Sequence, residues 1–198
     1  MSIGAVILAA GRSTRMGTNK LIAELGGKPL IRRTVEAVLA SRAHPVIIVT
    51  GHETQKLVEA LAGLEVLRVG NPRYAEGLST SLNIGLASLT DEARAALICL
   101  GDMPLIEPAT LDKLIESFEK EPERDAVVPA HGGEWGNPVL LSRKLFPLVA
   151  TLRGDMGARK LLQERNDVRV LEVGDPAILR DADTPEAFQD LQGRVGKI

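Results

Sequence analysis

The sequence predicts an α/β protein, a single Rossmann-like three-layer domain with a mostly parallel, twisted sheet. Short apolar runs alternate with amphipathic helical patterns along the whole chain, as a doubly wound sheet requires. Several of these runs are apolar at consecutive positions, which is typical of parallel strands covered on both faces. No low-complexity linker or internal repeat divides the 198 residues, so one domain spanning 1–198 is expected.

Each element is predicted from its own pattern. The predicted strands cover residues 5–8, 46–50, 66–69, 96–100, 126–129, 139–141 and 168–173. The predicted helices cover residues 30–40, 55–61, 81–89, 109–120, 157–163 and 185–191. Pro29 and Pro108 lie at the expected first turns of their helices, where a missing N–H group costs nothing. Thr184 is expected to cap the last helix, which starts at Pro185.

Composition excludes several classes of partner. The chain is 44% hydrophobic and 25% charged, as expected of an ordinary globular domain. Its net charge of −2 and its 3% aromatic content disfavour nucleic acid as a partner. No apolar stretch reaches about 18 residues, so no membrane span is expected. The lone Cys99 is expected to be a buried, unpaired thiol, and with no signal-peptide pattern at the N-terminus this favours a cytoplasmic location.

The opening of the chain is its most informative stretch. The first predicted strand, residues 5–8, is followed by Ala9, Ala10 and Gly11 and then by a loop containing Arg15 and Lys20. Small residues at the carboxyl end of a strand, followed by clustered cations, suit a polyphosphate, so a nucleoside triphosphate is expected here. The spacing fits neither the P-loop nor the dinucleotide-binding glycine pattern, which disfavours both of those classes. An ordinary solvated basic loop is the alternative.

The same stretch resembles the loop L-A-A-G-x-S-x-R-M-G-x-x-K, the signature of nucleotidyltransferases of the molybdenum cofactor cytidylyltransferase type. The resemblance implies the nucleotidyltransferase form of the fold, with a nucleotide-binding N-terminal half and an acceptor-binding C-terminal half. It implies catalytic roles for Arg15 and Lys20. The nucleotide-binding residues that it implies in this loop are Leu8, Ala9, Ala10, Gly11 and Lys20.

Two later segments contain the candidate metal ligands. The run before Gly101 ends in Gly-Asp, and Pro104 directs the chain away from the sheet, which presents Asp102 at the carboxyl edge of a strand. A carboxylate there can hold Mg²⁺ that bridges nucleotide phosphates, and a turn or helix-capping aspartate is the alternative. G-D-x-P and the late D-A-D-T-P-E stretch resemble metal-binding motifs of the same family. They imply that Asp102 is catalytic and that Asp102 and Asp183 bind Mg²⁺; an acidic helix start is the alternative for Asp183.

Further segments resemble the family's base and acceptor regions. The E-G-L-S-T-S stretch implies that Gly77 and Ser81 lie beside the base, and helix capping by its hydroxyl groups is the alternative. The G-N-P-V-L and G-D-M-G-A-R segments imply acceptor contacts by Asn137, Asp155 and Arg159. Asn137 replaces a histidine of better-studied members, which leaves the acceptor's identity open. Asp155 can also cap its own helix or pair with Arg159.

Together these segments run in family order along nearly the whole chain. They imply a magnesium-dependent transferase that joins CTP to a molybdopterin-type acceptor and releases pyrophosphate, with a molybdenum hydroxylase as client. Because the attacking phosphate oxygen is already an anion, no general base is needed. Ala10 replaces the first glycine of the L-A-G-G loop of guanylyltransferases, which predicts a preference for CTP over GTP. The alternatives are a related transferase with another acceptor, such as a sugar phosphate, and a non-catalytic nucleotide-binding accessory protein.

Overall fold

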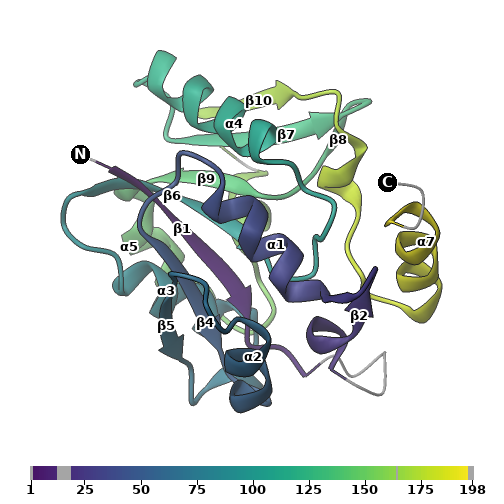
Figure 1. The fold of residues 1–198 in the computed structure, drawn as a ribbon. Helices are drawn as coiled ribbons and strands as arrows, with labels where there is room; N and C mark the ends of the chain where they lie inside the picture. Colours follow the sequence, from purple (N-terminus) through teal and green to yellow (C-terminus); the bar gives the residue numbers. More distant parts are fainter. Residues whose placement is uncertain (1, 13–18, 164, 196–198) are drawn as a thin grey trace.

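A twisted eight-stranded sheet forms the centre of the molecule (Figure 1). The computed structural model describes residues 2–12, 19–163 and 165–195. The strand order is β10-β7-β9-β6-β1-β4-β5, and β8 pairs with β7. The strands are β1 (Ser2–Ala9), β4 (Val46–Thr50), β5 (Leu67–Gly70), β6 (Ala93–Leu100), β7 (Ala126–His131), β8 (Glu134–Trp135), β9 (Val139–Ser142) and β10 (Val168–Glu172).

Helices cover both faces of this sheet. They are α1 (Leu30–Leu39), α2 (Thr54–Ala60), α3 (Leu78–Ala87), α4 (Pro108–Lys120), α5 (Phe146–Val149), α6 (Ala158–Leu162) and α7 (Pro185–Val195). Short 3₁₀ turns include η1 (Lys20–Ile22) and η2 (Tyr74–Glu76). A separate two-stranded hairpin joins β2 (Glu24–Leu25) to β3 (Lys28–Pro29), and its two loop residues Gly26 and Gly27 both have positive φ, as a tight hairpin turn requires.

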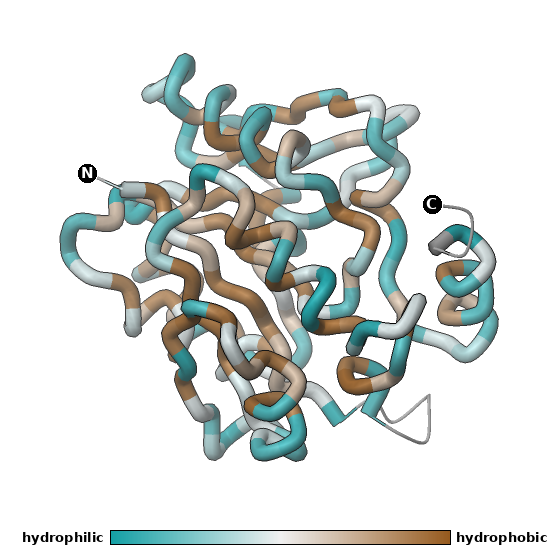
Figure 2. Tube along the Cα trace, in the orientation of Figure 1, coloured by the Kyte–Doolittle hydropathy of each residue, from teal (hydrophilic) through white to brown (hydrophobic). Residues whose placement is uncertain are grey.

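Side chains of β1 alternate between two apolar cores. Ile3, Ala5 and Ile7 belong to one core with buried residues of α1, α2 and α4, whereas Val6 and Leu8 belong to the other with residues of α3, α5 and α6. Figure 2 shows this hydrophobic interior as brown segments along the central strands and the inner faces of the helices. The fold is therefore the predicted three-layer α/β domain.

The structure confirms all seven predicted strands and six helices and adds details that the patterns did not indicate. The sheet is mixed because β9 runs antiparallel to both β6 and β7. The helix predicted from residue 81 begins at Leu78, and β8, α5 and the β2–β3 hairpin were not predicted. Pro108 occupies the first turn of α4, whereas Pro29 precedes α1 at its N-cap position. Cys99 is buried and free, as expected.

The topology places a crevice at the carboxyl end of β1. After β1 the chain builds β4 and β5 on one side and then crosses to β6 on the other, and β1 is parallel to both β4 and β6. Such a reversal of strand order opens a crevice at the carboxyl ends of the strands. Because Ala9 lies opposite Thr50 and Leu8 lies opposite Leu100, the loops after β1, β4 and β6 meet at one edge. None of the described helices is both long and apolar enough to cross a bilayer.

Candidate active site

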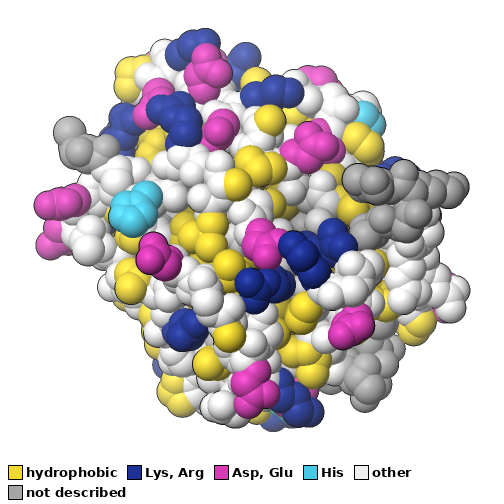
Figure 3. Space-filling model, viewed as in Figure 1, with side chains coloured by type: hydrophobic (Ala, Val, Ile, Leu, Met, Phe, Trp, Pro, Cys, Tyr) yellow, Lys and Arg dark blue, Asp and Glu magenta, His cyan; other side chains and the backbone are white. Residues whose placement is uncertain are grey.

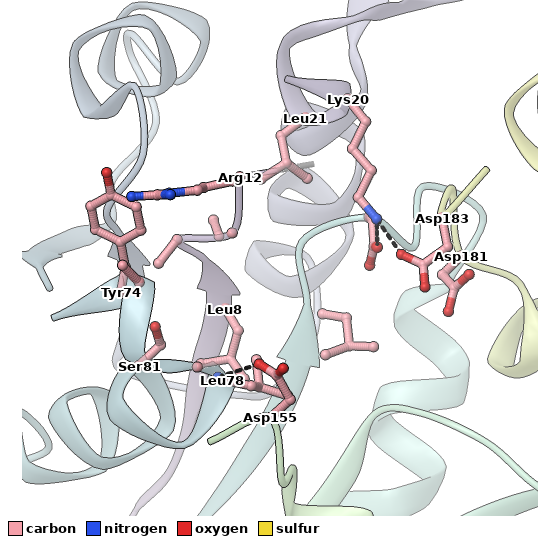
Figure 4. A pocket seen from close by; sticks show the side chains of 17 residues that line it. Leu8, Arg12, Lys20, Leu21, Tyr74, Leu78, Ser81, Asp155, Asp181 and Asp183 are labelled. Carbon is pink, nitrogen blue, oxygen red and sulfur yellow. Dashed lines mark hydrogen bonds and ion pairs between the residues drawn. The ribbon is translucent and has the colours of Figure 1, made fainter. Parts of the chain in front are cut away.

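A pocket of about 460 Å³ occupies this crevice (Figure 4). The structure brings most of the predicted site residues together on its wall. They are Leu8, Ala9, Ala10, Gly11, Lys20, Gly77, Ser81, Asp102, Asp155 and Asp183. Arg15 lies outside the described residues. Segments that are far apart in the sequence thus line one pocket.

Neighbouring strands hold the loop after β1 in place. The carbonyl of Leu8 accepts the N–H of Gly101 at 3.0 Å, and the carbonyl of Ala10 accepts the N–H of His52 at 3.2 Å. The Ala10 side chain is buried, and a Cβ placed on Gly51 would lie 2.9 Å from its methyl group. Gly11 is exposed, and a Cβ placed on it would meet nothing within 4 Å. The backbone at Gly11 is therefore open to a ligand.

The register of β1 and β6 places Asp102 beside this loop, as the sequence predicted for neighbouring strands. Gly101 lets the backbone pass close to α1, because a Cβ there would lie 2.8 Å from the Ile31 side chain. The hydroxyl of Thr34 donates to the Gly101 carbonyl at 3.1 Å and fixes the turn. Asp102 itself is buried, with 8% of its surface exposed.

Lys20 joins the two predicted metal ligands. Its Nζ donates to carboxylate oxygens of Asp102 and Asp183, each at 2.5 Å. The side chain starts from η1, where the Asn19 carboxamide oxygen accepts the N–H of Leu21 at 3.1 Å. Burial by itself lowers the pKa of Lys20, but the charges and hydrogen bonds of Asp102 and Asp183 outweigh burial and raise that pKa. Lys20 therefore stays a cation between two carboxylates.

The segment 181–183 is anchored to the turn that contains Asp102 by a backbone hydrogen bond. The N–H of Ala182 donates to the Asp102 carbonyl at 3.1 Å, and the Ala182 side chain is fully buried, in line with a packing role. Thr184 caps α7, since its hydroxyl oxygen accepts the N–H of Ala187 at 3.2 Å, so Asp183 is not the cap. Burial, followed by the negative charges of Asp102 and Asp183, raises the pKa of Asp181.

Gly77 and Ser81 lie where the start of α3 forms another wall of the pocket. Gly77 has φ of +112°, and a Cβ on it would lie 2.3 Å from the Gly154 carbonyl carbon, so the two backbones are in contact. Ser81 is buried and accepts a hydrogen bond from the Asn71 side-chain amide at 2.9 Å. Only a residue without a side chain fits at Gly77.

The predicted acceptor residues are divided between the pocket and its surroundings. Asp155 lines the pocket and caps α3, because its carboxylate accepts the N–H of Leu78 at 3.3 Å. The two alternatives for Asp155, capping its own helix or pairing with Arg159, are therefore both wrong. Asp155 caps α3, which is remote in sequence, and the Arg159 guanidinium donates to the Trp135 carbonyl at 2.8 Å. Neither Asn137 nor Arg159 is among the residues that line the pocket.

Sequence reasoning missed an aromatic contact on the pocket wall. Tyr74 and Arg12 line the pocket, and the guanidinium carbon of Arg12 lies 5.4 Å from the centre of the Tyr74 ring. Asp181 was missed as a further carboxylate beside Lys20. The only signal for Tyr74 was that the chain's single tyrosine occurs in the predicted base-side loop.

A known protein family matches most of this chain. The profile of the family described as "MobA-like NTP transferase domain" matches residues 5–170. The purine catabolism protein PucB of Bacillus subtilis is 32% identical over 92% of each chain. The molybdenum cofactor cytidylyltransferase of Escherichia coli K12 is 28% identical over 100% of this chain and 99% of that protein.

Solved structures agree with the sequence comparison. The crystal structure of Rv0371c from Mycobacterium tuberculosis superposes with a TM-score of 0.84, at 29% identity and 98% coverage of both chains. A structure of that protein in complex with manganese superposes with a TM-score of 0.81. The chain spans much less of some larger relatives, and its match covers 30% of the bifunctional protein GlmU of Geotalea uraniireducens.

Proposed function

Because the chain belongs to the MobA-like NTP transferase family, we propose that it is a metal-dependent cytidylyltransferase acting on a molybdopterin-type acceptor. The reaction joins the acceptor's terminal phosphate to the α-phosphorus of CTP and releases pyrophosphate. One observation carries this proposal: Lys20 meets Asp102 and Asp183 in the pocket beside the small-residue loop of β1. That pocket offers open backbone, a cation and paired carboxylates, which are the groups that phosphoryl transfer uses.

The carboxylates suit a magnesium ion. Asp102 and Asp183 point at one common position, which the Lys20 ammonium now contacts, so a cation already fits between them. Mg²⁺ prefers oxygen ligands and is usually bound by one or two carboxylates together with substrate phosphates and water, so a pair is sufficient. Within the described residues no group of three or more acidic, histidine or cysteine side chains is arranged to hold a metal on its own. When bound, Mg²⁺ would neutralise charge on the phosphates.

The chain's own groups carry the remaining steps. Backbone N–H groups of Ala10 and Gly11 would bind the phosphates at the end of β1. Lys20 would offset the charge that builds on the departing pyrophosphate, which requires its ammonium to leave at least one carboxylate for a phosphate oxygen. Arg15, outside the described residues, is proposed for the same task from its place in the signature loop. The nucleophile is already anionic, so catalysis consists of positioning and charge stabilisation.

The base and the acceptor would bind on opposite sides of the reacting phosphate. Gly77 and Ser81, with the buried methyl group of Ala10, support placing cytosine at the start of α3. Asp155 reaches the pocket from the C-terminal half and supports an acceptor site there. Asn137 and Arg159 would then contact only a part of the acceptor that extends out of the pocket, because neither residue lines it. The proposed client of the product is a molybdenum hydroxylase.

Pyrophosphate release tests the proposal. The purified chain is incubated with Mg²⁺ and each nucleoside triphosphate, with and without molybdopterin, and then with sugar phosphates as other acceptors. Release only with CTP and molybdopterin is the expected result. Asp102→Asn should lower the rate about 100- to 1,000-fold while the far-UV circular dichroism stays unchanged. Nucleotide binding without any release would indicate an accessory protein, and release with another acceptor alone would identify a different transferase.

A further inference from the structure

The charges on the pocket wall do not by themselves favour a polyanion. Among the described lining residues there are four carboxylates and only two cationic side chains, Arg12 and Lys20. Lys20 is engaged by the carboxylates of Asp102 and Asp183. Within the described residues, Arg12 contacts no carboxylate, and its guanidinium lies over the ring of Tyr74. Before any rearrangement, Arg12 is therefore the lining cation best able to receive a phosphate.

Tyr74 holds the Arg12 side chain along the pocket. The guanidinium carbon lies 5.4 Å from the ring centre, within the range of a cation–π contact. Figure 4 shows Arg12 extended toward Tyr74, whereas Lys20 points toward Asp183 at the other end of the pocket. The tyrosine ring is itself confined, because a Cβ on Gly51 would lie 2.7 Å from its Cβ and its Cγ. The His52 ring lies 6.1 Å from it.

We propose that Tyr74 is a positioning residue that holds the Arg12 guanidinium in place to bind an outer phosphate group, β or γ, of the incoming nucleotide. This inference rests on the proposed nucleotidyltransferase function. A guanidinium carries five N–H donors in a planar fork that matches phosphate oxygens, and contact with an aromatic face leaves those in-plane donors available. An arginine already held by a ring also loses less conformational freedom when the phosphate arrives.

The test is calorimetric titration of the full chain with CTP, CDP and CMP in the presence of Mg²⁺. Arg12→Ala should weaken CTP binding about tenfold or more and CMP binding much less, because charged hydrogen bonds to the outer phosphates are lost. Tyr74→Ala should weaken CTP binding about two- to fivefold, whereas Tyr74→Phe, which keeps the ring face, should match the wild type. Adding Tyr74→Ala to Arg12→Ala should have no further effect.

A stacked arginine elsewhere supplies the control. The Arg143 guanidinium lies 5.6 Å from the Phe146 ring, away from this pocket, so Arg143→Ala should leave nucleotide binding unchanged. The inference would be overturned if Arg12→Ala lost the same affinity for CTP as for CMP, or if Tyr74→Ala and Tyr74→Phe bound CTP equally well. A change only in the KM for the acceptor would also overturn it. If the wild type binds CTP and releases pyrophosphate while Arg12→Ala binds normally, only this inference fails. If the wild type binds no nucleotide, the proposed function fails with it.

Discussion

At the scale of the residue, Lys20 bridges two carboxylates, and under the proposed function this one contact would link nucleotide binding to metal binding. The ammonium neutralises part of the negative charge of Asp102 and Asp183, and it occupies the position from which both would reach a metal. A divalent cation arriving without nucleotide must therefore compete with Lys20. When phosphates are present, the ammonium has another anionic partner, and the carboxylates become available.

Lys20→Met should therefore have opposite effects on metal binding and on turnover. Without nucleotide, the variant should bind Mn²⁺ more tightly than the wild type, measured from the electron paramagnetic resonance signal of free Mn²⁺. Pyrophosphate release should fall about 100- to 1,000-fold, because a charge contact to the leaving group is lost. Arg12→Met removes the same charge from the other end of the same pocket, away from the Asp102 and Asp183 carboxylates, so its Mn²⁺ affinity should change much less. Weaker Mn²⁺ binding by Lys20→Met would contradict the competition.

Ala10→Gly should relax the preference for CTP over GTP without reversing it. The buried Ala10 methyl group lines the pocket, and a methyl-sized change in a binding site is worth about 1–3 kcal/mol of discrimination. The ratio of kcat/KM for the two nucleotides is the measurement. Ala5→Gly is the matched control, because Ala5 lies on the same strand, belongs to the core on the α1 side of the sheet and does not line the pocket. An unchanged ratio in Ala10→Gly would show that this methyl group does not distinguish the bases.

The start of α3 shows how two distant elements depend on one another. Gly77 contacts Gly154 backbone to backbone, and Asp155 caps the helix at Leu78. The Ser79 N–H also donates to the Gly154 carbonyl at 3.0 Å. One loop of the C-terminal half therefore supports the helix that forms the proposed base side of the pocket.

Gly77→Ala should lower the free energy of unfolding by about 1–3 kcal/mol or more, since the residue has positive φ and its new Cβ would overlap Gly154. Urea denaturation followed by circular dichroism measures this loss. Gly133→Ala is the control, because Gly133 has φ of +82° but nothing within 4 Å of a Cβ. The difference between the two variants isolates the backbone contact. Equal losses would show that only the backbone conformation matters at Gly77.

The elements that could be predicted from the sequence are those with a local cause. β1 and β6 were evident from their apolar runs, but their loops were expected to meet only if the two strands were neighbours, and the sheet order supplies that pairing. The helix boundary at Leu78 could not be predicted, because its cap comes from Asp155 across the fold. The same holds for the contact of Arg12 with Tyr74, which no periodicity encodes. Short elements such as α5 and β8 carry too few residues for a pattern.

At the scale of the whole molecule, the fold buries the Cys99 thiol in the central sheet and keeps reagents dissolved in water away from it. Cys99 lies in β6, a strand that pairs with β1 on one side and with β9 on the other. Only 3% of the Cys99 surface is exposed. Burial raises the pKa of Cys99 to about 12. Surface charge is mixed in sign, as Figure 3 shows for one face, so no single-sign field on that face favours thiolate formation.

Thiol labelling should therefore report global unfolding. At pH 8 the folded chain should react with a disulfide reagent only as fast as it unfolds, whereas the denatured chain should react at once with one thiol per chain. An unfolded cysteine has a pKa of about 8.5. Between that pH and about pH 12, the Cys99 thiol therefore keeps its proton in the folded state and loses it in the unfolded state. This residue's contribution to stability therefore falls as pH rises through that window. Rapid labelling under native conditions would show that β6 opens locally.

Trp135 and Tyr74 are the only tryptophan and the only tyrosine of the chain, and under the proposed function they would report on different substrates. Tyr74 lines the pocket proposed for the nucleotide, whereas the carbonyl of Trp135, on β8, accepts a hydrogen bond from Arg159, a proposed acceptor residue. Tryptophan can be excited separately from tyrosine, so the molecule carries an optical probe on each side. Indole emission should follow the arrival of the acceptor, and phenol emission that of the nucleotide. The order in which the two substrates bind is thus open to spectroscopy without any added label.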